Sequence, residues 1–287
     1  MIKSESQFNN IPNKSISLKR ESVTVIIPAF SREDLLLLSI KSVFNQTGNF
    51  NLDVVVVDDN SPNNLSIIVN SSFPDVRVIR NKSNVLSGIS RNNGLVLART
   101  KYVAFLDSDD MWKEDFLEMS MKTMVRKDCK ASVCLTKLIF DQNINLGFRI
   151  NILALTFVKS CLQLIFFYFN KGLMPKSAFY LCQLSHMVFC TEILKNIRFD
   201  PKYNSGGVDW NFVIKAMDKT SVAIVSRKLT FYRYHSKSWI QNQQKLRNKW
   251  KSYMQLFGDL KKRKINGIMI MFFRMYVNIY RRGRRVL

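Results

Sequence analysis

The chain has 287 residues, 47% of them hydrophobic, which excludes wholesale disorder and allows one or two domains with a sizeable core. Its 44 Lys and Arg against 21 Asp and Glu give a formal net charge of +23, so an anionic partner is expected: nucleic acid, a nucleotide or an anionic membrane. Five cysteines without C-x-x-C spacing and only two histidines exclude a disulfide framework, a zinc cluster and a histidine-rich metal site.

Short β-branched runs alternate with longer helical patterns from Val23 onward. Residues 1–20, before them, are polar and predict a flexible N-terminal lead-in without the apolar core of a secretory signal. Continuous apolar strands separated by helices indicate a mainly parallel sheet covered on both faces, and therefore an α/β domain. The expected strands are 23–27, 53–57, 76–79, 102–106, 133–138 and 186–190, and the expected helices are 32–46, a segment after Pro62, and 83–98.

Polar residues gather where the predicted strands end. The first strand runs into Pro-Ala-Phe at 28–30, the second into Asp-Asp at 58–59, and the fourth into Asp-Ser-Asp-Asp at 107–110. Ligands of open α/β sheets bind beyond the carboxyl ends of the strands, and hard divalent cations prefer oxygen ligands. The two acidic clusters therefore predict a cation site at this edge of the sheet. Asp110 by itself is interpreted as a cap of the following helix.

A long apolar run, 152–169, lies within an apolar insertion that covers 141–185. The run is nearly long enough to cross a bilayer, which takes about 20 mostly apolar residues, but Lys159, Ser160 and Gln163 interrupt it. A buried helix pair or an interfacial segment is therefore favoured over a full span.

The end of the chain, 241–287, has apolar residues at helical spacing and many basic residues. This pattern predicts basic amphipathic C-terminal helices. They lie either at a membrane surface or against the rest of the protein, and the total charge favours the membrane.

Four spaced motifs occur in order: VTVIIPAF, DVVVVDDNS, SGISRNNGLVLARTKYVAFLDSDDMW and FDPKYNSGGVDWNFVIKA. Together they resemble the family-2 inverting glycosyltransferases, which are nucleotide-sugar enzymes of the GT-A fold. The resemblance covers 21–127 and, more weakly, 186–240. It implies a Rossmann-like GT-A domain over 21–240, an inverting mechanism, and Mn2+ or Mg2+ as cofactor.

The resemblance also implies which residues meet the nucleotide. Pro28, Ala29 and Phe30 match the loop that packs on the base and ribose. Asp59 matches the acid that hydrogen-bonds the base, usually uracil, and Arg91 matches an arginine near the nucleotide.

The remaining matches concern the metal and the chemistry. Asp107 and Asp109 match an Asp-x-Asp motif around Ser108, with Asp109 the direct metal ligand and Asp107 closer to the ribose and the metal. Asp209 matches the catalytic base, although a helix cap is its alternative role. His235 resembles a late histidine that faces the metal or the diphosphate, and a surface-loop histidine is the equal alternative.

Three positions depart from the family pattern. Ser31 follows Phe30 where Tyr-Asn is common, and Ser90 replaces the usual Ala before the arginine. Val208 replaces the Glu that usually precedes the base, so the carboxylate that helps to hold an acceptor in relatives is missing here.

These patterns predict a metal-dependent hexosyl- or N-acetylhexosaminyltransferase that uses a nucleoside-diphosphate sugar, with UDP expected, and a glycan acceptor. The basic surface extends this to a polyprenyl-diphosphate-linked acceptor in O-antigen or capsule synthesis. The enzyme would then be cytoplasmic and peripherally bound to the inner face of the cell membrane. The alternatives are a nucleotidyltransferase on a related fold and a nucleic-acid-binding protein. Dispersed basic residues and the lack of a binding motif disfavour nucleic acid as a partner.

Overall fold

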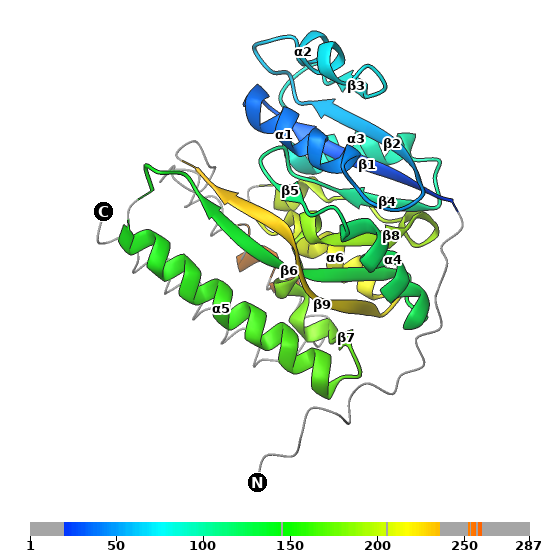
Figure 1. Ribbon diagram of the computed structural model, residues 1–287, viewed down its shortest axis with the longest axis vertical. Helices are drawn as coiled ribbons and strands as arrows, with labels where there is room; N and C mark the ends of the chain where they lie inside the picture. The colour runs from blue at the N-terminus through cyan, green and yellow to red at the C-terminus, as the bar shows by residue number, and fades with distance from the viewer. Residues whose placement is uncertain are drawn as a thin grey trace.

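The computed structural model describes residues 20–144, 146–204 and 206–235, together with Ser252, 254–256, 258 and 259. These residues form one nine-stranded sheet with helices on both faces (Figure 1). The predicted lead-in, apart from Arg20, and the predicted C-terminal helices, apart from the few positions named, lie outside the described residues. The α/β class with a mostly parallel sheet is confirmed.

The first half of the chain alternates strands and helices as predicted. β1, β2, β3 and β4 are parallel neighbours in the order β3-β2-β1-β4, so their carboxyl ends meet at one edge. The strands are β1 (Glu21–Ala29), β2 (Phe50–Asp58), β3 (Arg77–Arg80) and β4 (Tyr102–Phe105), and the helices are α1 (Glu33–Phe44), α2 (Leu65–Ser72) and α3 (Leu86–Leu97).

The second half makes the sheet mixed. β8 runs antiparallel to both β4 and β6, while β6 and β9 are parallel, and the order continues β4-β8-β6-β9-β5 with β7 also paired to β9. The strands are β5 (Met111–Trp112), β6 (Ala131–Phe140), β7 (Leu173–Met174), β8 (Met187–Cys190) and β9 (Val222–Tyr234). The helices are α4 (Phe116–Arg126), α5 (Leu146–Phe169) and α6 (Val208–Met217), and short 3-10 turns cover Lys176–Leu181, Leu184–His186, Thr191–Leu194 and Pro201–Tyr203.

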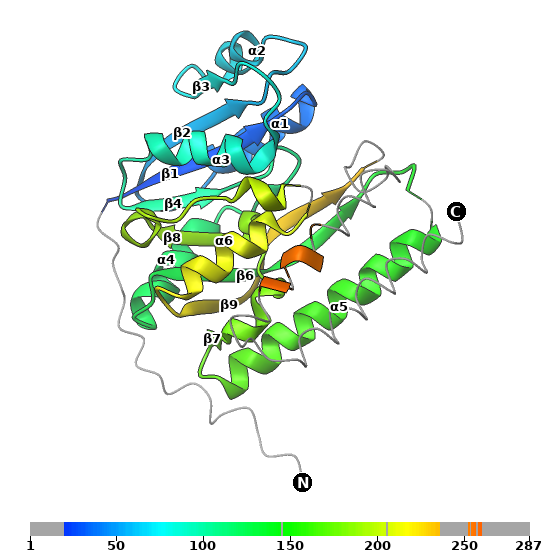
Figure 2. The same ribbon diagram turned by 180° about the vertical axis from the view of Figure 1, so that it is seen from behind.

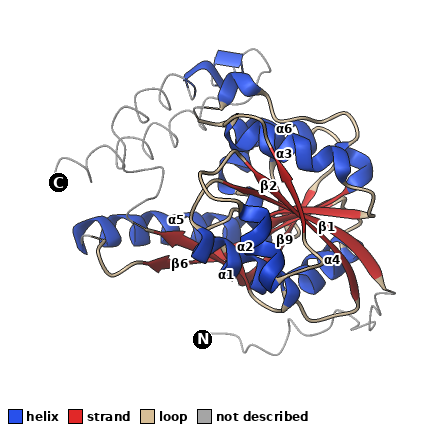
Figure 3. Cartoon of the chain, turned by 90° about the horizontal axis from the view of Figure 1, so that it is seen from above, coloured by secondary structure: helices blue, strands red, loops and turns tan. Residues whose placement is uncertain are grey.

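Two cores lie on opposite faces of the sheet. α1, α2 and α4 pack on one face, and α3 and α6 pack on the other, as the view from above shows (Figure 3). The α6 side contains an aromatic cluster in which Phe199 stacks on Phe212 with ring centroids 4.0 Å apart, and Phe105 of β4 meets Phe212 edge-on at 5.5 Å. This cluster connects α6 to the sheet directly below the carboxyl end of β4.

Three features differ from the predictions. β9 was not predicted from the sequence, although it is the longest strand. Asp110 does not cap a helix, because α4 begins only at Phe116 and Asp110 is instead buried against β9. The buried helix pair expected in the apolar insertion is wrong, because α5 is a single 24-residue helix. Its segment Arg149–Phe169, with mean hydropathy 1.9, is long and apolar enough to cross a membrane. Only 12% of it is buried, so it is not a core helix of the domain.

The close approach of α3 to the sheet depends on Gly94. A Cβ atom at this position would lie 2.5 Å from Cγ2 of Ile26 and 3.2 Å from Cγ2 of Val57, both on strands. We therefore expect Gly94→Ala to lower the free energy of unfolding by about 1–3 kcal/mol through overpacking, although alanine favours the helix by about 1 kcal/mol. Urea unfolding measures this. Val96→Ala, at an exposed position of the same helix, is the control and should change stability little; an equally stable Gly94→Ala protein would contradict the packing described.

Candidate functional site

The candidate site lies beyond the carboxyl ends of β1, β2 and β4. Pro28 and Ala29 end β1 opposite Val57 and Asp58 of β2. The next residue, Phe30, is 42% exposed, so its ring is open to a flat ligand. The position agrees with the predicted stacking surface, and its contact with a base stays a prediction.

The acidic tip after β4 is a tight turn. Asp110 N donates to Asp107 O at 3.0 Å, which closes the four-residue turn and leaves Ser108 buried within it. Asp110 points inward, where its Oδ1 accepts from the backbone nitrogen of Arg233. Burial and the neighbouring carboxylates raise the pKa of Asp110 well above its usual value. Asp110 therefore anchors the turn, and Asp107 and Asp109 keep 35% and 21% of their side chains exposed.

Arg91 joins this tip to α6. Its Nη2 donates to Asp107 Oδ1 at 2.6 Å, and its Nη1 donates to Asp209 Oδ1 at 2.9 Å. The arginine comes from the middle of α3, and α3 and α6 lie over the same face of the sheet (Figure 2). Asn92 holds the segment before α6 in place, because its side chain exchanges two 2.8 Å hydrogen bonds with the backbone of Phe199.

The Arg91 guanidinium is buried but charged. Only 3% of its side chain is exposed, and the ring centroid of Phe199 lies 5.5 Å from Cζ. Burial alone would lower the pKa of Arg91, but the carboxylates of Asp209 and Asp107 outweigh it and raise the pKa. The same charge balance keeps Asp209 next to Asp107 in spite of their mutual repulsion.

Asp209 stands in the first turn of α6, and it does not take the N-cap position. The cap is Gly207, whose φ of 88° is a left-handed conformation that favours glycine. The Asp209 side chain is 38% exposed and is held by Arg91 on one side. One carboxylate edge is thus oriented by the protein while the group remains open to solvent.

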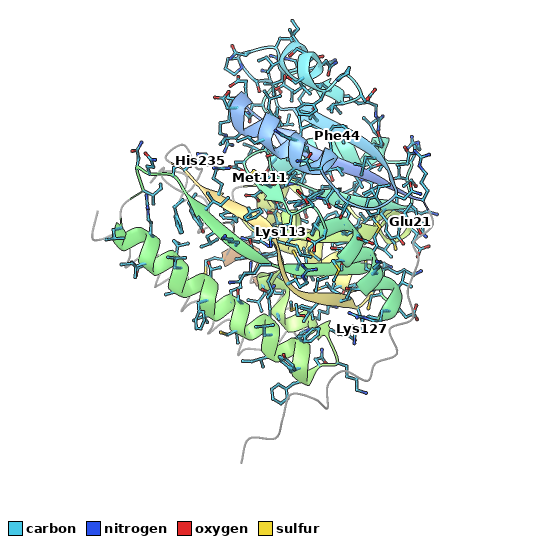
Figure 4. All side chains as sticks on the ribbon, viewed as in Figure 1. Glu21, Phe44, Met111, Lys113, Lys127 and His235 are labelled. Carbon is cyan, nitrogen blue, oxygen red and sulfur yellow. The ribbon has the colours of Figure 1, made fainter. Side chains whose placement is uncertain are left out.

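Asp109 has a different set of cationic neighbours. Arg32 Nη1 donates to Asp109 Oδ2 at 2.6 Å, and His235 Nε2 lies 3.0 Å from the same oxygen and 3.1 Å from the guanidinium nitrogen. Burial would raise the pKa of Asp109, but the hydrogen bond to His235 and the charge of Arg32 hold it below its usual value. His235 is 3% exposed at the end of β9 (Figure 4), so the surface-loop alternative for it is wrong.

The donor set around Asp109 fits a divalent cation that shares its coordination with a ligand. Among the described residues there is no group of three or more His, Cys, Asp or Glu side chains that could hold a metal ion by themselves. However, Mg2+ and similar ions usually bind through one or two carboxylates together with substrate phosphates. The Arg32 guanidinium forms an ion pair with Asp109 beside His235, so this carboxylate already has a positively charged neighbour.

Asp59 holds α3 rather than reaching the acidic tip. Its Oδ1 accepts from Asn81 Nδ2 and the backbone nitrogen of Val85, and its Oδ2 accepts from the backbone nitrogen of Leu86, all at 2.9 Å. The carboxylate is 4% exposed on the same rim as Phe30. Its predicted contact with a base stays a prediction, and its observed contacts secure the start of the helix that carries Arg91.

Sequence reasoning brought together most of this site but missed several polar contacts. Five predicted residues form two hydrogen-bonded groups that the turn at 107–110 joins: Asp107, Arg91 and Asp209 in one, and Asp109 and His235 in the other. The residues that were missed are those that orient the cluster: Arg32, Asn81, Asn92 and Arg233. Only Arg32 had a signal, since it directly follows the loop after the first strand.

A family model and several curated proteins match parts of this chain. The model of the family described as "Glycosyl transferase family 2" matches residues 24–198. A UDP-Glc:alpha-D-GlcNAc-diphosphoundecaprenol beta-1,3-glucosyltransferase from Escherichia coli, WfaP, is 36% identical over 94 residues, which are 32% of this chain and 37% of that protein. The chain spans less than half the length of the curated relatives that it matches first, between 16% and 37%.

Solved structures share the fold at low identity. Staphylococcus aureus TarS 1-349 in complex with UDP-GlcNAc superposes with a TM-score of 0.59 at 18% identity, covering 76% of this chain and 60% of that one. The mannosyltransferase PcManGT from Pyrobaculum calidifontis, in complex with GDP-Man and Mn2+, has a TM-score of 0.58 at 18% identity, covering 83% of this chain and 66% of that one.

Removal of the Arg91 charge should destabilise the protein in a pH-dependent way. Arg91→Met leaves Asp107 and Asp209 facing each other, so we expect the free energy of unfolding to fall by about 1–3 kcal/mol. The loss should be larger at pH 8 than at pH 5, because burial and the neighbouring carboxylates raise the pKa of Asp107, so protonation of Asp107 relieves the repulsion as the pH falls. Urea unfolding at the two pH values measures this. Arg77→Met, which breaks the exposed pair with Asp53, is the control and should cost at most about 1 kcal/mol; equal losses at both positions would contradict the role given to Arg91.

Proposed function

This chain belongs to glycosyl transferase family 2, and on that premise we propose that it moves a sugar from a nucleoside-diphosphate sugar to a glycan acceptor with inversion. UDP is the expected nucleotide, and a hexose or an N-acetylhexosamine is the expected sugar. WfaP is a UDP-Glc-dependent glucosyltransferase and the TarS structure holds UDP-GlcNAc, and both support the choice of UDP.

The single observation that carries the proposal is the bridge from Asp107 through Arg91 to Asp209. It places the partly exposed carboxylate of Asp209 close to the acidic tip, because one guanidinium contacts both, and the three groups come from three different parts of the chain. Inverting transfer needs a base on the face of the sugar opposite the leaving group. Asp209 meets this requirement if the diphosphate binds at the tip.

The proposed reaction is a single displacement. Asp209 accepts the proton of the acceptor hydroxyl while that oxygen forms a bond to the anomeric carbon. The bond between the anomeric carbon and the distal phosphate oxygen breaks, and the nucleoside diphosphate leaves with the electron pair. Arg91 remains charged throughout, which keeps Asp209 oriented before it takes the proton and stabilises Asp107 beside the departing anion.

Asp109 and His235, with Asp107 beside them, would hold Mn2+ or Mg2+ at the diphosphate. A bound cation of this kind neutralises negative charge on the leaving group. The Mn2+ named for PcManGT supports this assignment. Arg32 contacts Asp109 Oδ2, so a cation held by Asp109 would compete with this guanidinium for the carboxylate.

We further propose that the acceptor is linked to a polyprenyl diphosphate, in the synthesis of a bacterial surface polysaccharide such as O-antigen or capsule. The name of WfaP, whose acceptor is carried on diphosphoundecaprenol, supports this class of acceptor. A membrane-held acceptor and a net charge of +23 both favour a cytoplasmic enzyme that binds peripherally to the inner face of the cell membrane.

Product analysis tests the proposal against its alternatives. The protein is incubated with a panel of nucleotide sugars, Mn2+ and a lipid-linked acceptor, and the released nucleotide is identified. Free nucleoside diphosphate supports glycosyl transfer, whereas release of pyrophosphate would establish a nucleotidyltransferase. Salt-sensitive binding of polynucleotides without binding of any nucleotide sugar would overturn both enzymatic readings.

Asp209→Asn should separate donor binding from transfer. The amide keeps the shape of the side chain and accepts from Arg91, so we expect the affinity for the donor to change less than about threefold while turnover falls by about 10²–10⁴-fold. Thermal shift with the donor and release of nucleoside diphosphate are the two measurements. Full activity in this variant would show that the base is another residue.

Asp109→Ala should remove the dependence on the divalent cation. We expect turnover with Mn2+ to fall to the level without added metal, and binding of Mn2+ in the presence of UDP, followed by electron paramagnetic resonance, to be lost. Asp75→Ala, at an exposed position outside the site, is the control and should leave both measurements unchanged. Unaltered binding of Mn2+ in the Asp109 variant would place the cation elsewhere.

A further inference from the structure

The long helix α5 exposes apolar side chains to solvent and directs polar side chains toward the protein. Among the side chains of α5 that the structure describes, the exposed ones are all apolar or aromatic, apart from Gly147, and the largest exposed fractions are 71% for Phe157, 72% for Tyr168 and 87% for Phe169. They recur at helical spacing and form one outward stripe: Leu146, Gly147, Ile150, Leu153, Ala154, Phe157, Val158, Ile165, Tyr168 and Phe169. An exposed apolar stripe of this length marks an interaction site.

The polar side chains of α5 face the protein instead. Lys159 Nζ donates to Gln183 Oε1 at 3.1 Å, and Gln163 Nε2 donates to Leu181 O at 3.4 Å. Arg149 Nη2 donates to the carbonyl oxygens of Asp141 and Gln142 at 2.6 and 2.7 Å. Burial lowers the pKa of Lys159 to about 8, which is a further sign that this charge is directed away from solvent. These inward side chains thus hydrogen-bond to the domain, whereas the outward side chains are apolar.

α5 cannot cross a bilayer while the sheet is intact. The strand before it, β6, pairs with β9 up to Phe140 and Tyr234, and the strand after it, β7, pairs with the other end of β9 at Leu173 and Ala223. The helix of about 36 Å therefore runs alongside one strand with both ends tethered, at the outer edge of the molecule (Figure 1). Only an orientation in the plane of a membrane keeps both tethers.

Charge indicates what covers the apolar stripe. Between Asp141 and Glu192 the sequence has no acidic residue, and the exposed Lys171 is basic just beyond the end of α5. Lys127 Nζ donates to the backbone oxygen of Lys171 just beyond the end of α5, which places a second basic side chain there. A second copy of the chain would bring two net charges of +23 together, while anionic lipid would neutralise them.

We propose that α5 is the membrane-docking element of this protein: it lies at the boundary of headgroups and acyl chains of an anionic bilayer, with the outward stripe inserted. Tyr168 and Phe169 then sit at one end of the helix, where aromatic rings suit the interface. The docking rests on the proposed function only in that a lipid-linked acceptor would give the enzyme a reason to bind the membrane. The binding itself needs neither donor nor metal.

Vesicle flotation of the full chain, without nucleotide or metal, tests the inference. The vesicles contain phosphatidylcholine with 30% phosphatidylglycerol (about one lipid in three anionic, a typical strongly attractive surface) or phosphatidylcholine alone. The test variant combines Ile150→Ser, Phe157→Ser and Phe169→Ser. The matched control combines Leu38→Ser, Ile67→Ser and Val96→Ser, which remove equally exposed apolar side chains from α1, α2 and α3. The single change Phe157→Glu serves in case the triple variant does not fold.

We expect the unaltered chain and the control to float with the anionic vesicles, and the triple variant and Phe157→Glu to lose at least tenfold in partition coefficient. Thermal unfolding without lipid should show no loss of stability in the variants. Equal flotation of all proteins would overturn the proposal, because another surface would then bind the lipid. A dimer of the unaltered chain that dissociates in the triple variant would assign the stripe to a second copy. A lower unfolding temperature in that variant would assign it to residues 236–287 of the same chain.

Membrane docking and sugar transfer are tested by separate measurements. If the unaltered chain does not float but still transfers sugar to a soluble acceptor analogue, only the docking proposal is wrong. If the Asp209→Asn protein is inactive but still floats, the docking surface is intact.

Discussion

Arg91 holds a positive charge inside the protein between two carboxylates that come from distant parts of the chain. Asp107 follows a sheet strand, Asp209 begins a helix 118 residues away from the arginine, and only 3% of the Arg91 side chain reaches solvent. Two carboxylates at this proximity would repel each other without a buried cation between them. The position of α6 relative to the acidic tip, and with it the geometry of the whole candidate site, therefore depends on this bridge and on the aromatic cluster that supports it.

Each carboxylate of the acidic tip is either paired with a cationic side chain or buried. Asp107 is paired with Arg91, Asp109 with Arg32 and His235, and Asp110 is buried as an anchor. Arg32 is the N-cap residue of α1, where it has a left-handed backbone conformation, and its side chain donates to one oxygen of Asp109. A cation bound together with a diphosphate would exchange one positive neighbour of Asp109 for another, so the local charge balance changes little between the two states.

The site and the long helix belong to the same sheet. His235 directly follows β9 and lies beside Asp109, and the other end of β9 pairs with the strand that follows α5. A protein that meets a bilayer along α5 would hold the carboxyl ends of its strands at a fixed height and angle to the lipid surface. An acceptor carried on a polyprenyl diphosphate is confined to that surface, so a rigid connection between docking element and site would reduce the orientational freedom lost on binding.

The alternation of strands and helices, and the polar residues that end the strands, followed from the sequence by itself, because periodicity and turn residues are local properties of the chain. The long strand β9 escaped, since its polar and basic residues weaken the strand pattern and its pairing with β6 is with a segment about 90 residues away. Tertiary structure alone decided that Arg32 reaches Asp109, that Arg91 joins Asp107 to Asp209, and that the polar face of α5 points inward. Periodicity identifies an apolar stripe, but which side of a helix faces the protein depends on partners such as Gln183 and Leu181 that only the folded chain brings near.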